Sequence, residues 1–289
     1  MTDYSPVLLC NSFCLLGESP VWDSSSETLF WTDVVGKKVW QWSQKQGASS
    51  GNVSQSVGGL ARASNGKLVV ASERGVGFYT PGMTEINMIE SDLSPAGTLM
   101  NDCKCDRQGR LIAGSKILQG KKRNACRFVI DKGTVKNTKR GYLIWNGPAF
   151  SPEGDRVYFA DSPTRRIFHA SYNIKKGHFG WARTFTKLSD DEGYPDGMTI
   201  DAEGRLWSAR WGGWCVVRYD ASGKVDLKIQ LPVPNPTSLT FGGPDYRDLY
   251  ITSAREGLSE QELGDAPLSG AVFVIRTENQ GLEEVTYSV

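Results

Sequence analysis

The sequence predicts an all-β protein, a six-bladed β-propeller whose four-stranded blades surround a central channel. Three observations support this fold class. A short motif recurs six times along the 289 residues, strand-like runs follow each copy, and no long stretch shows the ~3.6-residue apolar period of an amphipathic helix. The whole chain, residues 1–289, is therefore expected to form one propeller domain.

The recurring motif is a polar turn containing Asp or Gly, followed by a short β-rich run that often ends in a small or acidic residue. Its copies begin at Asp23, Ser64, Asp106, Ser151, Asp201 and Gly243. The steps between the apolar runs are roughly 40–50 residues, which is the length of one four-stranded blade. Six copies therefore predict six blades.

A second strand-like segment follows each copy of the motif. These segments are VWQWS, GVGFYT, CRFVID, RIFHASY, VVRYD and AVFVI. Their aromatic and β-branched residues alternate or run continuously, as they do in half-buried and buried strands. Residues 259–268, SEQELGDAPL, have room for one helical turn but are expected to form a loop.

The charge balance and the hydropathy pattern exclude two classes of partner. The formal net charge is +1, which argues against nucleic-acid binding. The densest basic cluster, GKKRN at residues 120–124, is predicted to be a solvated hairpin loop. No apolar run approaches the ~18 residues of a membrane helix, and the N-terminal residues lack the basic region of a signal peptide. We expect neither nucleic acid nor a membrane as a partner.

The six cysteines are too few and too irregularly spaced for a disulfide framework in a chain of this length. Free thiols and a cytoplasmic location are therefore expected. Cys103 and Cys105 are one residue apart in a strand-like run and share a face of it. No other metal-ligating pair stands beside them, so they are interpreted as packing residues.

Polar residues interrupt the pattern just ahead of four copies of the motif. They are Glu18, Asn101 with the adjacent Asp102, Asn146 and Asp196. Each alone could be a surface acid or a turn former. Repeat symmetry, however, places all of them at equivalent positions around one axis, where carboxylate and amide oxygens suit a divalent cation.

Five segments resemble the signature segments of the gluconolactonase/regucalcin family, also called the senescence marker protein family. They are LGESPVWD, MNDCKCDRQGRL, NGPAFSPEGDRVYFADS, YPDGMTIDAEGRLWSARWGG and TSLTFGGPDYRDLYITSAR. The resemblance covers nearly the whole chain, and the WGG and FGGPD runs are similar to bacterial sugar lactonases. It implies a six-bladed propeller that uses one divalent metal to hydrolyse a small lactone, most simply a pentono- or glucono-type sugar lactone.

By this resemblance, Glu18, Asn146 and Asp196 are the metal ligands and Asn101 contacts the substrate. The metal can be calcium, zinc, manganese, magnesium or iron. Lactone hydrolysis needs a polarised carbonyl, an activated water and a stabilised oxyanion, and a divalent ion supplies the first and the third. Asp196 is expected to be the general base, held rigidly by Gly193, Pro195 and Gly197 around it.

The chain departs from the family at Leu99, where an Arg that reaches the substrate is common. Leu cannot donate a hydrogen bond, so the substrate pocket is either less polar or served by another residue. Lys116, Lys121 and Arg210 are the open alternatives. We expect a high KM for simple sugar lactones or a preference for more apolar ones.

Two functions remain as alternatives to a sugar lactonase. One is a non-catalytic propeller that binds a metal or a protein partner, and the other is a metal-dependent esterase for less polar lactones or esters. A serine hydrolase is not expected. GASSG at residues 47–51 matches G-x-S-x-G but is expected in a polar loop between strands, and His169 and His178 are expected in or beside an outer strand. A monomer or small homo-oligomer is expected.

Overall fold

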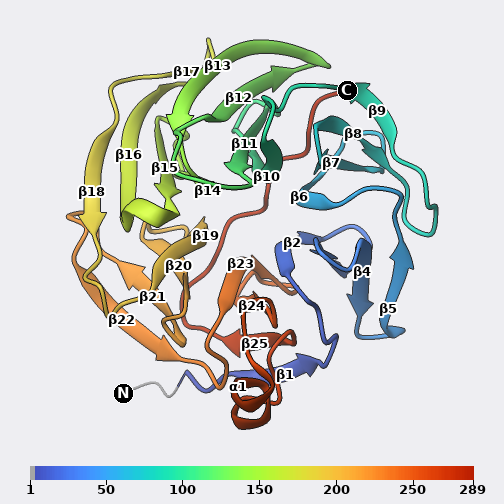
Figure 1. The fold of residues 1–289 in the computed structure, drawn as a ribbon, viewed down its shortest axis with the longest axis vertical. Coiled ribbons are helices and arrows are strands. Elements are labelled where there is room, and N and C mark those ends of the chain that lie inside the picture. Colours follow the sequence, from blue (N-terminus) through green and yellow to red (C-terminus); the bar gives the residue numbers. More distant parts are fainter. Residues whose placement is uncertain (1–3) are drawn as a thin grey trace.

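Six antiparallel sheets are arranged radially around a common centre in the computed structural model, which describes residues 4–289 (Figure 1). The predicted six-bladed β-propeller is thereby confirmed. Each of the six second strand-like segments predicted from the sequence is the third strand of a blade, counted outward from the channel. The recurring motif is the turn between the first two strands of each blade, together with the second strand.

The first three blades have four strands each. Blade 1 contains β2 (Gly17–Asp23), β3 (Thr28–Asp33), β4 (Lys38–Ser43) and β5 (Gly47–Asn52). Blade 2 contains β6 (Val57–Arg62), β7 (Leu68–Ser72), β8 (Gly75–Tyr79) and β9 (Asn87–Glu90). Blade 3 contains β10 (Thr98–Cys105), β11 (Leu111–Ile117), β12 (Ala125–Asp131) and β13 (Thr134–Tyr142).

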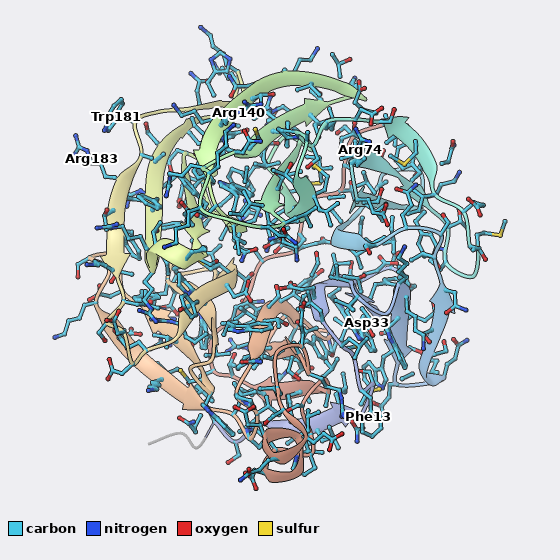
Figure 2. The ribbon with its side chains drawn as sticks, viewed as in Figure 1. Phe13, Asp33, Arg74, Arg140, Trp181 and Arg183 are labelled. Atoms are coloured by element: carbon cyan, nitrogen blue, oxygen red, sulfur yellow. The ribbon has the colours of Figure 1, made fainter. Side chains whose placement is uncertain are left out.

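Blade 4 departs from the four-stranded pattern. It contains β14 (Trp145–Phe150), β15 (Arg156–Asp161), the 3-10 helix η1 (Ser162–Thr164), β16 (Arg166–Asn173), β17 (His178–Phe179) and β18 (Arg183–Lys187). Both β17 and β18 pair with β16, so two short strands share its outer edge. Between them Trp181 projects from the outer rim of the molecule with 87% of its surface exposed (Figure 2).

The N-terminal strand closes the ring. Blade 5 contains β19 (Tyr194–Ile200), β20 (Leu206–Trp211), β21 (Cys215–Tyr219) and β22 (Val225–Gln230). Blade 6 contains β23 (Pro236–Gly242), β24 (Asp248–Ser253) and β25 (Val272–Arg276), and β1 (Val7–Cys10) pairs with β25 as its outermost strand. Nothing in the sequence pattern predicted this closure.

Every innermost strand contains a β-bulge. The register shifts lie between Glu18 and Val21, Val57 and Gly59, Met100 and Cys103, Asn146 and Ala149, Pro195 and Met198, and Pro236 and Leu239. A bulge bends its strand and redirects the side chains beside it. Residues next to these bulges can therefore point along the channel instead of into the space between blades.

Apolar clusters fill the spaces between neighbouring blades. Cys103 and Cys105 lie in one such cluster with Ala61, Val69 and Leu111, so their interpretation as packing residues is confirmed. Burial raises the pKa of the Cys103 thiol, which keeps it protonated and unreactive. All six cysteines are free thiols.

The C-terminal segment crosses the centre of the propeller (Figure 1). Gly281 pairs with Asp201, and Tyr287 pairs with Ala63, on different blades. Glu284 forms an ion pair of 2.7 Å with Lys104, near the end of β10. The segment therefore closes one opening of the channel, above which a cavity of about 20 Å³ remains, room for about one water.

Two local expectations were wrong. Residues 259–268 contain a helix, α1 (Glu260–Asp265), because Ser259 and Glu262 form a capping box that satisfies its first N–H groups. Residues 47–52 form strand β5, not a loop, but no helix follows, so no nucleophile elbow exists there. Residues 120–124 form the predicted loop. In the described part of the chain, no helix is both long and apolar enough to cross a membrane.

Candidate active site

The structure brings the four predicted site residues together at one end of the channel. Glu18, Asn101, Asn146 and Asp196 lie on β2, β10, β14 and β19, each beside or inside the bulge of its strand. Asn146 Nδ2 donates a hydrogen bond of 2.7 Å to Asp196 Oδ1. Asn101 Nδ2 donates to Asn146 Oδ1 and, at 3.1 Å, to the carbonyl of Trp145. Three blades are thus linked through two amides and one carboxylate.

The glycines beside these residues are required by close approach of the strands. Gly147 has φ of 54°, and a Cβ there would lie 2.7 Å from the carbonyl oxygen of Asp196. A Cβ on Gly197 would lie 2.1 Å from the hydroxyl of Ser238. Because only glycine avoids both contacts, the Asn-Gly and Asp-Gly pairs are explained by the packing of neighbouring blades around the channel.

Two further side chains hold the site in place. Ser162 Oγ accepts a hydrogen bond of 2.9 Å from Asn146 Nδ2 and donates one of 2.6 Å to the carbonyl of Pro195. Asp102 Oδ2 accepts the N–H of Gly147 at 2.7 Å. Repeat symmetry placed Asp102 in the set of oxygens that suit a divalent cation but did not predict this hydrogen bond. Ser162 was missed, since it lies outside the repeated position.

The site is rich in buried negative charge. Glu18, Asp102 and Asp196 are exposed by only 9%, 7% and 7%. Burial raises the pKa of Glu18, and repulsion from Asp196 and Asp102 raises it further. Burial, and then the charge of Asp102, raises the pKa of Asp196. Burial raises the pKa of Asp102 to about 6, against the N–H of Gly147, which lowers it.

This set of donors fits a divalent cation. Neither Glu18 nor Asp196 forms an ion pair with Lys or Arg within residues 4–289, and buried carboxylates without such partners favour a bound cation. No group of three His, Cys, Asp or Glu in that range could hold a metal. A cation at this site would therefore need an amide oxygen, and Asn146 Oδ1 keeps a second lone pair beside the hydrogen bond from Asn101.

Leu99 lies half-buried on β10, directly opposite Lys116 of β11. The three basic residues that could replace the missing Arg differ in where they lie. Lys121 is exposed in the loop after β11. Arg210 is buried in blade 5, where it donates to the hydroxyl of Tyr219. Lys116 is half-buried, and its charge lowers the pKa of Glu18, so it is the basic residue beside the site.

The fold and the site together define a class: six-bladed propellers with a buried, carboxylate-rich site at one end of the channel. Residues 16–255 match the family model described as SMP-30/Gluconolactonase/LRE-like region, and the chain belongs to this family. The family predicted from sequence motifs is confirmed.

Similar proteins cover nearly the whole chain. It is 33% identical over 279 residues to the pentonolactonase XacC of Haloferax volcanii, with 94% of each chain covered. It is 30% identical to the L-arabinolactonase of Azospirillum brasilense, covering 97% of this chain and 95% of that one. The crystal structure of a calcium-binding protein, regucalcin, from Agrobacterium tumefaciens superposes with a TM-score of 0.94 at 27% identity, covering 99% and 98%. The family thus includes sugar lactonases.

Proposed function

We propose that this protein is a divalent-metal-dependent lactonase that opens a small sugar lactone of the pentono or glucono type. The observation that carries the proposal is the convergence of Glu18, Asn146 and Asp196 at one end of the channel, where Glu18 and Asp196 are buried and form no ion pair with Lys or Arg within residues 4–289. The sugar-lactonase names of several relatives support the substrate class.

Glu18, Asn146 and Asp196 would hold the cation. When bound, a divalent ion polarises the lactone carbonyl, stabilises the developing oxyanion and acidifies water. The neutral amide of Asn146 limits the negative charge around the ion, so less of its Lewis acidity is lost. The two carboxylates of Glu18 and Asp196 would balance the charge of the ion.

Asp196 would also be the general base that takes the proton of the attacking water. Asn146 Nδ2 holds Asp196 Oδ1 and so fixes the plane of the carboxylate. In the metal-free chain, burial raises the pKa of Asp196, and a bound cation would lower it again. The arrangement of the base is set before the substrate arrives, which lowers the entropic part of the barrier.

Asn101 would orient both the site and the substrate. Its amide nitrogen donates to Asn146 and to the carbonyl of Trp145. Its Oδ1 forms no hydrogen bond with any of the described residues and can accept one from a lactone hydroxyl. The free acceptor is the observation that supports the predicted contact between Asn101 and the substrate.

The proposal is tested by measuring the hydrolysis of a panel of lactones in the presence of several divalent metals. The metal-free protein, reloaded separately with each ion, should hydrolyse sugar lactones with at least one of them. Asp196→Ala should lose both metal binding and activity. Asp196→Asn should keep part of the metal affinity, measured by calorimetry, and lose turnover by about 100-fold or more.

Asp191→Asn is the matched control, because Asp191 is an exposed acid just ahead of β19, and it should leave both quantities unchanged. Full turnover of Asp196→Asn at saturating metal would contradict the general-base role. No hydrolysis of any lactone with any of the metals would contradict the lactonase itself.

A further inference from the structure

Lys116 is held between the two strands that supply the amides of the site. Its Cα is paired with that of Leu99 on β10, the strand that carries Asn101. It also forms an isolated bridge with Ile144, two residues before Asn146. Directly paired residues project from the same face of a sheet, so the side chains of Lys116 and Leu99 lie on the same face of blade 3.

The ammonium group of Lys116 is unpaired among the residues that the structure describes. The side chain is half-buried but forms no hydrogen bond or ion pair with any residue of the described part, 4–289. Lys104 of the same blade is different, since it pairs with Glu284 at 2.7 Å on the closed side of the channel. Lys116 Nζ is not among the buried polar atoms that lack a partner, so the ammonium group is open to solvent and available to an anionic group of a ligand.

The position of Lys116 follows from the strands that hold it. Its two backbone partners, Leu99 and Ile144, each stand two residues before an amide of the site, Asn101 and Asn146. Side chains two positions apart in a strand project from the same face, so Lys116 lies on the face that carries these amides.

We propose that Lys116 determines the substrate specificity of this lactonase by binding a carboxylate carried by the lactone, so that the preferred substrates are lactones of sugar diacids. The inference rests on the proposed function. The unpaired ammonium supplies the charge-assisted hydrogen bonds, while Leu99 opposite it adds an apolar wall and no competing donor.

Two matched lactones test this inference: D-glucono-γ-lactone and D-glucaro-γ-lactone, which differ in a terminal hydroxymethyl or carboxylate group. The wild type, loaded with the ion that supports activity, should have the higher kcat/KM on the acidic lactone. Lys116→Met should reduce that value by about 10- to 100-fold, chiefly through KM. The same variant should change kcat/KM for the neutral lactone by less than about threefold.

Lys116→Arg and Lys121→Met are the matched variants. Lys116→Arg keeps the positive charge and should keep the higher kcat/KM for the acidic lactone. Lys121→Met removes an exposed lysine from the following loop and should leave kcat/KM unchanged for both lactones. Higher salt should raise the wild-type KM for the acidic lactone only. An equal loss on both lactones, no loss on either, or a wild-type preference for the neutral lactone would overturn the inference.

Binding of the open-chain products separates this inference from the proposed activity. The affinities of wild type and Lys116→Met for D-glucarate and D-gluconate are measured by calorimetry, without turnover. Glucarate binding that weakens about 10-fold or more in Lys116→Met supports the site even if the wild type hydrolyses neither lactone, in which case the proposed function fails alone. Glucarate affinity that does not depend on Lys116 overturns the inference.

Discussion

Asn146 is the residue through which the parts of the site are connected. Its amide nitrogen donates to Asp196 at 2.7 Å and to Ser162 at 2.9 Å, and its carbonyl oxygen accepts from Asn101. An aspartate in this place could not make the two donations and would add another charge to a buried acidic site. A single neutral side chain thus sets the orientation of the expected base.

Asp102 makes the stability of the metal-free protein depend on pH. Its pKa is raised to about 6 in the folded chain, above the ~3.9 of an unfolded Asp. The folded state therefore binds more protons between these values, so the contribution of Asp102 to the free energy of unfolding falls as pH rises through that window.

Asp102→Asn should remove this dependence, because the amide remains neutral and can still accept the N–H of Gly147. The difference in free energy of unfolding, variant minus wild type, should grow by about 2–3 kcal/mol between roughly pH 4 and 7. Urea unfolding in the presence of a chelator measures it at several pH values. A constant difference would mean that Asp102 does not titrate in this range.

Leu99→Arg should restore a donor at the wall of the pocket. We expect the ratio of kcat/KM for a sugar lactone to that for an alkyl lactone to rise about 10-fold, mainly through KM, because the contact exists in the ground and transition states alike. Lys116 opposite it repels the added charge and limits the gain.

Leu99→Met is the control for Leu99→Arg, since it keeps an apolar side chain of similar volume and should leave the ratio unchanged. Metal content is checked in each variant. If Leu99→Arg also left the ratio unchanged, Leu99 would not face the substrate, and the expectation of a less polar pocket would lose its basis.

At the scale of the element, a buried aspartate organises the turn between the first two strands of blade 5. Asp201 Oδ1 accepts the N–H groups of Glu203 and Arg205 at 3.0 and 2.9 Å. Asp201 Oδ2 accepts from Arg205 Nε at 2.9 Å and from Trp207 Nε1 at 3.1 Å. The Asp of the motif is therefore a structural residue, and its recurrence reflects turn geometry.

Asp201→Ala should lower the free energy of unfolding by about 3–5 kcal/mol, because it leaves Arg205 and the indole N–H of Trp207 without their buried partner. Chemical denaturation measures the loss. Asp220→Ala is the matched control: Asp220 accepts similar turn N–H groups from Ser222 and Lys224 but lies near the surface. A loss in Asp220→Ala as large as that in Asp201→Ala would refute the argument.

At the scale of the whole molecule, both ends of the described chain join distant parts of the ring. Strand β1 completes blade 6 beside β25, and the C-terminal segment crosses the channel to reach blade 2 through Tyr287 (Figure 1). Such contacts hold the first and last blades together without a covalent link. The single domain over residues 1–289 remains a prediction, as do the cytoplasmic location and the oligomeric state.

Limited trypsinolysis tests the single domain. Lys121 and Lys122 lie in the exposed loop between β11 and β12, so cleavage should occur there first. We expect the two fragments to stay associated in size-exclusion chromatography and to unfold in one thermal transition, because the blades bury their apolar faces against each other. Fragments that separate and remain folded would show two independent domains.

Much of the fold and part of the site followed from the sequence alone. The six turn-and-strand copies, the third strand of each blade and the shared position of Glu18, Asn146 and Asp196 are all encoded locally. A turn or a strand depends on residues within a few positions of one another. Repetition then relates one blade to the next, and the family motifs named the expected ligands.

The remaining features were decided by the tertiary structure. The pairing of β1 with β25, the two hydrogen bonds of Ser162, the burial of Arg210 and the unpaired ammonium of Lys116 all depend on residues that are distant in the chain. Lys116, Lys121 and Arg210 were equivalent candidates in sequence. Strand register and the packing of the blades decide which of the three lies beside Glu18 and Asp196. Both depend on residues that are distant in the sequence, so the local sequence pattern does not predict them.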